Sequence, residues 1–276
     1  MKGTLTFLLA AITNLVSAQT FHGIVYDADT KEPIPFVSIG ILHKSQGTVA
    51  QLDGSYSITI NELYDNDTLK ISIIGYTPKI FIVKNFKQQY PSGEANIYLQ
   101  QQMEDLNAVV IRPRELKEVQ LGNDFNSPSI IAGFKSDSLG SEIGTIMKVK
   151  DGRKYYLKTA GINIGACRYD SITFRINIYD FEDGTPGALL PTRPIYATVK
   201  KDQRSLVIDL EPYDIVVDND FILSIEWVED LPDKTTAFML CAGLIGNRIF
   251  YKQVSQDDWR SFPVAVGMYC VAEYEK

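Results

Sequence analysis

Residues 23–76 constrain the fold more than any other part of the chain. Short runs of alternating apolar and polar residues are separated there by Pro33, Pro35, several glycines and the pair Asp53-Gly54. Alternation with a period of two is the pattern of half-buried β-strands, and Pro, Gly and Asp-Gly are turn signals. The stretch therefore predicts a small β-sandwich in which Asp53-Gly54 forms a hairpin turn.

The first domain, residues 19–101, is expected to be a seven-stranded sandwich. The expected strands are 21–26, 36–42, 47–49, 56–60, 68–74, 80–83 and 95–99. Their core positions should be Val37, Ile39, Ile41, Tyr56, Ile58, Ile60, Leu69, Ile71 and Ile73. A sandwich of this size hides two sheet faces from water and can fold alone.

The β pattern resumes in residues 144–276 and predicts a second, jelly-roll-like sandwich. The expected strands are 145–149, 155–164, 171–179, 195–199, 205–210, 221–228, 237–243, 248–252 and 266–274. In 171–179, Phe174, Ile176 and Ile178 should be buried, while Arg175 and Asn177 should face water. Residues 102–143 are polar and aperiodic, so we expect a linker with a short helix near 115–119. The whole chain is thus predicted to be all-β.

The first domain resembles the carboxypeptidase-regulatory-like domain. The matching residues are Gly23, Val25, Asp27, Thr30, Glu32, Pro33, Pro35, Val37, Ile39, Gly47, Thr48, Asp53, Gly54, Tyr56, Ile58, Leu69, Ile71, Ser72, Gly75 and Tyr76. The resemblance implies a transthyretin-like (prealbumin-like) sandwich, a fold common in exported proteins of Gram-negative bacteria. It brings no catalytic residues, because the motif consists of turn and core positions. The second half is similar at fold level to jelly-roll modules, many of which bind sugars.

The first eighteen residues have the features of a signal peptide. Lys2 precedes an apolar stretch at 5–16, and Val16-Ser17-Ala18 is a small-residue cleavage site that leaves Gln19 as the mature start. This apolar stretch is too short for a permanent bilayer span, and no later stretch is long and apolar enough for a transmembrane helix, so the mature chain should not span a membrane. We therefore expect a location in the periplasm or at the cell surface.

Charge and reactive residues argue against several classes of function. The net charge of −7 disfavours nucleic acid as a partner. The only histidines are His22 and His43, and no zinc or nucleotide motif is present, so no catalytic residues and no cofactor are expected. Cys241 and Cys270 could pair across neighbouring strands, although three reduced, buried cysteines, Cys167 included, are the slightly favoured alternative.

Acidic pairs and one tryptophan remain as candidate sites. The Asp pairs lie in predicted turns, where Asp caps backbone amides, and Asp180 with Asp183 is only a weak calcium candidate. Trp259 lies between Asp258 and Arg260 in a predicted loop, which suits recognition of a glycan or a protein, although a partly buried lid residue is an equal alternative.

The favoured function is a non-catalytic, exported cell-envelope protein that binds a protein partner. The first alternative is a carbohydrate-binding protein of a glycan-use or adhesion system. The second alternative is a hydrolase that uses paired carboxylates.

Overall fold

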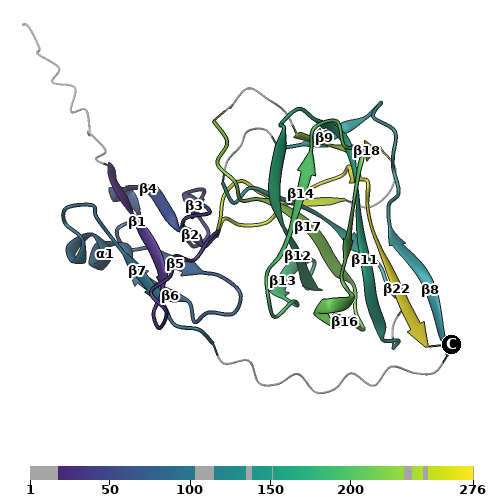
Figure 1. The fold of residues 1–276 in the computed structure, drawn as a ribbon, viewed down its shortest axis with the longest axis horizontal. Helices are drawn as coiled ribbons and strands as arrows, with labels where there is room; N and C mark the ends of the chain where they lie inside the picture. Colours follow the sequence, from purple (N-terminus) through teal and green to yellow (C-terminus); the bar gives the residue numbers. More distant parts are fainter. Residues whose placement is uncertain are drawn as a thin grey trace, which may run out of the picture.

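The structure is a computed structural model that describes residues 18–102, 115–134, 139–150, 152–232, 238–244 and 248–275. It is all-β, as predicted, and its strands form two sandwiches that lie side by side (Figure 1). Across the described residues, no helix has the length and apolar character needed to cross a membrane. The expected signal peptide lies outside these residues except for Ala18, the first residue of β1.

The first sandwich has the seven predicted strands. One sheet has the order β4-β1-β7, and the other has the order β3-β2-β5-β6. The strands are β1 (Ala18–Asp27), β2 (Ser38–Ile41), β3 (Gly47–Val49), β4 (Ser55–Asn61), β5 (Thr68–Ser72), β6 (Lys79–Ile82) and β7 (Ile97–Leu99). Every predicted core position is buried except Ile73, which packs against the core while partly exposed. A short helix, α1 (Val83–Gln89), was not predicted, and it buries Val83 and Phe86.

The Asp53-Gly54 turn is present, but it does not form a hairpin. Gly54 has a φ of 76°, and Ser55 accepts a backbone hydrogen bond from Gln51. However, β3 pairs with β2 and β4 pairs with β1, so the turn carries the chain from one sheet to the other. The sequence signal identified the position of the turn, whereas the strand pairing depends on the packing of the two sheets.

The second sandwich is formed by two larger sheets. One has the order β13-β12-β17-β10-β19-β20 with β14 also on β12, and the other has the order β21-β18-β11-β22-β8 with β15 and β16 on β11 and β9 on β18. Its strands are β8 (Leu116–Gly122), β9 (Ile131–Gly133), β10 (Glu142–Met147), β11 (Tyr155–Cys167), β12 (Ser171–Glu182), β13 (Thr185–Leu189), β14 (Ile195–Lys200), β15 (Ser205–Asp209), β16 (Val216–Val217), β17 (Phe221–Trp227), β18 (Phe238–Gly243), β19 (Ile249–Lys252), β20 (Arg260–Phe262), β21 (Ala265–Val266) and β22 (Met268–Glu275). Trp227, Phe174, Phe221 and Phe238 are the largest fully buried side chains of its core.

The expected linker contains two strands of this second sandwich. β8 pairs along its whole length with β22, and β9 pairs with β18. The short helix expected at 115–119 is therefore wrong, because those residues belong to an edge strand. Only Leu121 of β8 is buried, so the strand has too few apolar residues to be recognised from the sequence.

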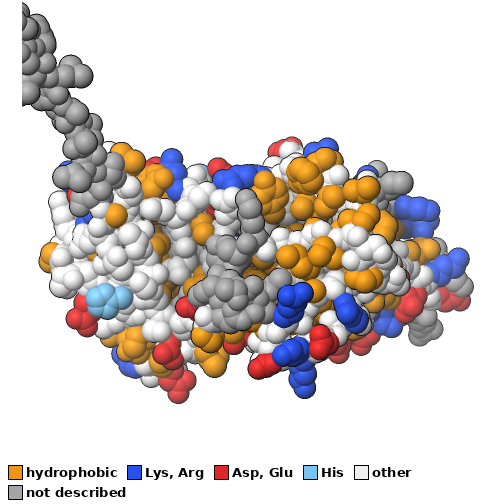
Figure 2. All heavy atoms as spheres, turned by 90° about the horizontal axis from the view of Figure 1, so that it is seen from above, with side chains coloured by type: hydrophobic (Ala, Val, Ile, Leu, Met, Phe, Trp, Pro, Cys, Tyr) orange, Lys and Arg blue, Asp and Glu red, His pale blue; other side chains and the backbone are white. Residues whose placement is uncertain are grey.

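The two sandwiches are in close contact. The outer face of β2 and β3 has glycines at Gly40 and Gly47, and a Cβ atom at either position would lie within 2.3 Å of the carbonyl oxygen of Ser255. The loop between β19 and β20, residues 253–259, can therefore lie directly on the sheet of the first sandwich. Phe36 and Val49 also pack against Val228 in a small apolar cluster between the sandwiches. The face drawn in Figure 2 shows an elongated molecule with basic and acidic side chains interspersed.

The three cysteines are free and buried. Cys241 and Cys270 do not form the cross-strand disulfide that the sequence left open. Burial raises the pKa of the Cys270 thiol to about 12, so it stays protonated and unreactive at neutral pH.

Candidate functional site

A cleft of about 820 Å³ lies between the two sandwiches. One wall comes from β5 and residues 73–78 of the first sandwich, and the opposite wall is the edge strand β13. Arg175, Asn177 and Tyr179 of β12 form its floor together with Glu226 of β17, and the 253–259 loop lines one end. The cleft therefore exists only because the two sandwiches are docked.

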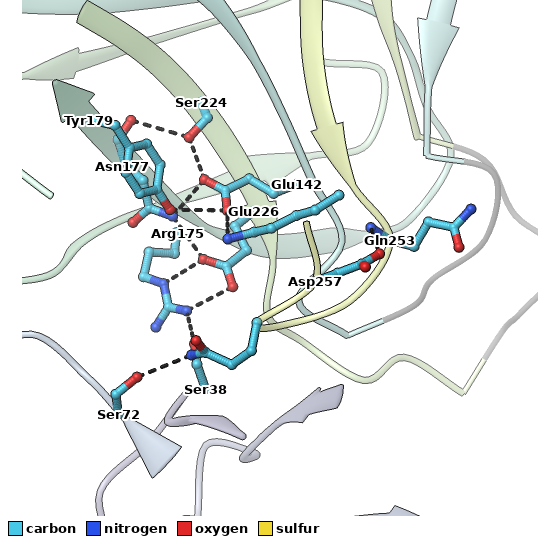
Figure 3. Close-up of polar contacts among 12 residues, drawn as sticks. Ser38, Ser72, Glu142, Arg175, Asn177, Tyr179, Ser224, Glu226, Gln253 and Asp257 are labelled. Carbon is cyan, nitrogen blue, oxygen red and sulfur yellow. Dashed lines mark hydrogen bonds and ion pairs between the residues drawn. The ribbon is translucent and has the colours of Figure 1, made fainter. Parts of the chain in front are cut away.

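Arg175 joins the two sandwiches at this floor (Figure 3). Its Nε and one terminal nitrogen donate to the two carboxylate oxygens of Glu226, both at 2.8 Å. The guanidinium also donates to the carbonyl oxygen of Phe36 at 2.8 Å and to Ser38 Oγ at 2.6 Å, both in the first sandwich. A planar guanidinium suits such a bidentate contact, and here it satisfies backbone and side chain of the neighbouring sandwich as well.

A second carboxylate lies directly beside this ion pair. Asn177 Nδ2 donates to Glu226 at 2.8 Å and to Glu142 at 2.9 Å. Glu142 is paired with Lys252 Nζ at 2.6 Å and also accepts from the Tyr179 hydroxyl at 3.2 Å. Among the residues that the structure describes, Asn177 Oδ1 has no hydrogen-bond partner. Two buried carboxylates are thus neutralised by two cations, and one acceptor in a cleft-lining residue remains unused.

The electrostatics of the floor follow from this pairing. Burial acts to raise the pKa of Glu226, but the charges of Arg175 and Lys252 outweigh burial and hold that pKa below its usual value. Burial and the neighbouring Glu142 raise the pKa of Tyr179 well above its ordinary value. Glu226 is therefore ionised and Tyr179 is neutral at physiological pH, so the floor is a fixed array of charges and dipoles.

The 253–259 loop is held by Asp257. This carboxylate accepts from Ser45 Oγ at 3.1 Å, from the Asp258 amide at 2.9 Å and from the Gln253 amide at 3.3 Å. Arg260 lies 3.4 Å from it and also donates to Ser45 at 3.2 Å. These contacts fix the loop to the first sandwich and set the position of the residues that follow Asp257.

The three predicted binding residues lie at or beside the cleft. Trp259 is partly exposed in the cleft wall, with its ring edge-to-face against Tyr179 at 5.5 Å and the Lys252 ammonium 4.8 Å from the ring centroid. Asp258 lies at the exposed mouth, 2.6 Å from Nδ1 of His43. Arg260 does not line the cleft but fixes the loop through Asp257. His22 lies on β1, bridged to Glu94, away from the cleft lining.

The structure gives no support to a calcium site at Asp180 and Asp183. Asp183, with a φ of 51°, forms the tight β12–β13 turn with Gly184, and Asp180 packs beneath Gly187. No group of three or more His, Cys, Asp or Glu side chains suited to a metal ion occurs in the described ranges.

Sequence reasoning missed the floor residues. The alternation predicts that Arg175 and Asn177 face water, yet they are only 6% and 2% exposed, and Glu226 beside them on β17 is 2% exposed. The available signal was a set of charged and amide side chains at alternate positions of two long apolar strands, β12 and β17. That pattern cannot tell a solvated face from one that another domain covers.

Comparison with known proteins identifies the first sandwich only. A family model described as the CarboxypepD_reg-like domain matches residues 21–111. No curated protein matches the chain.

Three solved structures show weak similarity. The major pilin subunit of Bacillus cereus, BcpA*(D312A), is 12% identical with a TM-score of 0.20, over 91% of this chain and 69% of that chain. The infectious bursal disease virus Gx strain is 8% identical with a TM-score of 0.24, over 96% and 83% of the two chains. The infectious bursal disease virus VP2 subviral particle is 10% identical with a TM-score of 0.21, over 94% and 80%. TM-scores this low support no inference about this chain.

The motif residues and the family match agree on the same part of the sequence. The chain is thus similar to the CarboxypepD_reg-like domain family over residues 21–111, about a third of its length.

Proposed function

We propose that the chain is an exported, non-catalytic cell-envelope protein that binds a carbohydrate in the cleft between its sandwiches. The observation that carries the proposal is the partly exposed ring of Trp259 in the wall of a concave site with a polar, buried floor. The volume of about 820 Å³ is in the range of ligand pockets. A protein partner, the function that the sequence favours, would bind on a flat surface or a free strand edge rather than in this concave cleft.

The chemistry of the cleft suits a polyhydroxylated ligand. An aromatic ring packs against the C–H face of a sugar, and fixed donors and acceptors orient its hydroxyl groups.

The carboxylates that line the cleft favour binding over hydrolysis. Glu226 is held by Arg175, Asp257 is held by Ser45 and backbone amides, and Asp258 is paired with His43. A general acid needs a proton near neutral pH, whereas Glu226 is held ionised by its cations.

The test is a glycan array of bacterial, host and plant glycans, probed with the wild type and with Trp259→Ala. Loss of an aromatic anchor costs about 2 kcal/mol, so we expect affinity for the bound glycan to fall roughly 30-fold. The matched control is Phe262→Ala, because Phe262 is exposed on neighbouring β20 and does not line the cleft. Absence of wild-type binding to every glycan, or full binding by Trp259→Ala, would contradict the proposal.

A further inference from the structure

Strand β6 is an edge strand of the first sandwich, and its register shows which backbone groups are unpaired. The order β3-β2-β5-β6 leaves one side of β6 open. The Leu42 amide donates to the Thr68 carbonyl, so alternate residues of β5 starting with Thr68 bond to β2. The Val83 amide donates to the Asp67 carbonyl, which places the β5–β6 bonds at the other residues of β5.

The open edge therefore belongs to the two isoleucines of β6. Leu69 and Ile71 pair with Phe81 and Lys79, so those residues of β6 direct their N–H and C=O groups to β5. The N–H and C=O groups of Ile80 and the N–H of Ile82 point to the open side, whereas the Ile82 carbonyl, at the N-cap of α1, accepts the first hydrogen bond of that helix. Apart from the bonds of the sheet and of α1, no backbone hydrogen bond involves Ile80 or Ile82 within the described part of the chain.

The side chains at this edge are also exposed and apolar. Ile80 is 63% exposed and Ile82 is 43% exposed. Ile80 lies opposite Lys70 and Ile82 lies opposite Thr68, so both isoleucines are on the sheet face that continues into the cleft. Native proteins usually block such edges with proline, bulges or charges, as Pro186 does on β13. In β6 the only charged residue is Lys79.

The charges around β6 indicate which kind of strand would pair with its open edge. Lys70, Lys79 and Lys84 have no carboxylate within ion-pair distance among the described residues, whereas Lys44 and Lys87 nearby are paired with Asp67 and Asp65. Three uncompensated cations beside an open edge are complementary to an acidic segment. They would repel the same lysines of a second copy of this chain.

We infer that β6 is a docking edge for an extended, acidic segment of a partner protein, which joins the sheet as an additional strand. Ile80 and Ile82 supply the backbone hydrogen bonds and contact apolar side chains at alternate positions of that segment. The intervening acidic side chains reach Lys79 and Lys84. This inference is independent of the carbohydrate cleft, since it uses neither Trp259 nor the floor residues.

The register can be checked first in the free protein by amide hydrogen exchange. We expect the amides of Ile80 and Ile82 to exchange quickly and those of Lys79 and Phe81 to exchange slowly. Slow exchange at Ile80 and Ile82 would show that the edge is already occupied and would overturn the inference.

Binding is then measured by calorimetry with a synthetic peptide that alternates valine and glutamate, and with a control peptide that alternates valine and lysine. We expect the acidic peptide to bind at least tenfold more tightly and to protect the amides of Ile80 and Ile82. Ile80→Glu should weaken binding at least tenfold, because it places a like charge on the edge. Ile80→Thr, which keeps a β-branched side chain, should weaken binding less and shows that the strand still folds.

The matched control is Phe262→Glu on β20, another exposed strand edge, which should bind the peptide as the wild type does. The inference would be overturned if both peptides bound equally well, if the acidic peptide protected the amides of another strand, or if Ile80→Glu did not weaken binding. A wild-type dimer in sedimentation that Ile80→Glu separates would also overturn it, because the occupant would then be a second copy. Trp259→Ala should leave peptide binding unchanged, so the peptide result does not depend on whether the glycan proposal is correct.

Discussion

At the residue scale, the position of the two sandwiches depends on Arg175. Its guanidinium uses four hydrogen bonds, two to Glu226 and two to the first sandwich. A buried ion pair contributes little net stability, but loss of one partner leaves an uncompensated buried charge. The main effect of Arg175 is therefore on the relative position of the two sandwiches, and so on the shape of the cleft.

Arg175→Met should destabilise the protein by about 3–5 kcal/mol, because Glu226 would remain buried without its main counter-charge. The double variant Arg175→Met, Glu226→Met should recover most of that loss, since both charges are then absent. Urea unfolding of the three proteins checks this expectation. A double variant no more stable than Arg175→Met would mean that the contacts to Phe36 and Ser38 dominate.

A second prediction at the residue scale concerns Asp27, at the end of β1. The backbone amides of Thr30 and Asp29 donate to its carboxylate at 3.0 and 2.8 Å, and the Tyr76 hydroxyl and Gln101 also donate to it. These bonds lower its pKa from 3.8 to about 2. Because the folded-state pKa lies below the unfolded value, the stabilisation is complete above pH 4 and is lost as the pH falls towards 2.

Asp27→Asn removes this titration while it keeps an oxygen that can accept the amide hydrogen bonds. We expect the wild type to have the higher melting temperature at pH 6 and the difference to shrink as the pH approaches 2. Thermal melts of both proteins across this range measure the effect. A difference that stays constant with pH would show that the charge of Asp27 is not the stabilising feature.

At the element scale, β8 and β22 show where sequence patterns fail. β8 contributes seven residue pairs to β22 but buries only Leu121, so its place in the sheet depends on backbone pairing rather than on an apolar face. The strands of the first sandwich have strong alternation and were predicted almost completely. A weakly amphipathic edge strand cannot be told from a polar linker without its partner strand.

The pairing of β8 predicts the outcome of truncation. A fragment of residues 115–276 retains β8 and β9 and should fold, whereas residues 144–276 leave the edge of β22 open and remove the start of β10. We expect the shorter fragment to aggregate, because an unpaired strand edge templates association. Size-exclusion chromatography and amide NMR spectra compare the two. If the 144–276 fragment is monomeric and gives a well-dispersed NMR spectrum, the second domain folds from residue 144 and this prediction is wrong.

At the scale of the whole molecule, the cleft is a product of domain docking. The outward face of β12 is polar, and it becomes a buried floor only because the first sandwich and the 253–259 loop cover it. Trp259 and Asp258 were singled out from the sequence because of their residue types in a loop. Only the folded chain brings these two residues close to His43 and to the floor residues.

The sequence by itself determined the all-β class, the family resemblance of the first sandwich and most of its core, since alternation and turn residues act over a few neighbouring positions. Only the tertiary structure decided that Arg175, Asn177 and Glu226 are buried, that β8 and β9 belong to the second sandwich, and that a cleft separates β5 from β13. These features depend on contacts between residues more than a hundred positions apart. A local pattern records which side chains lie on each face of a strand, but not what covers that face.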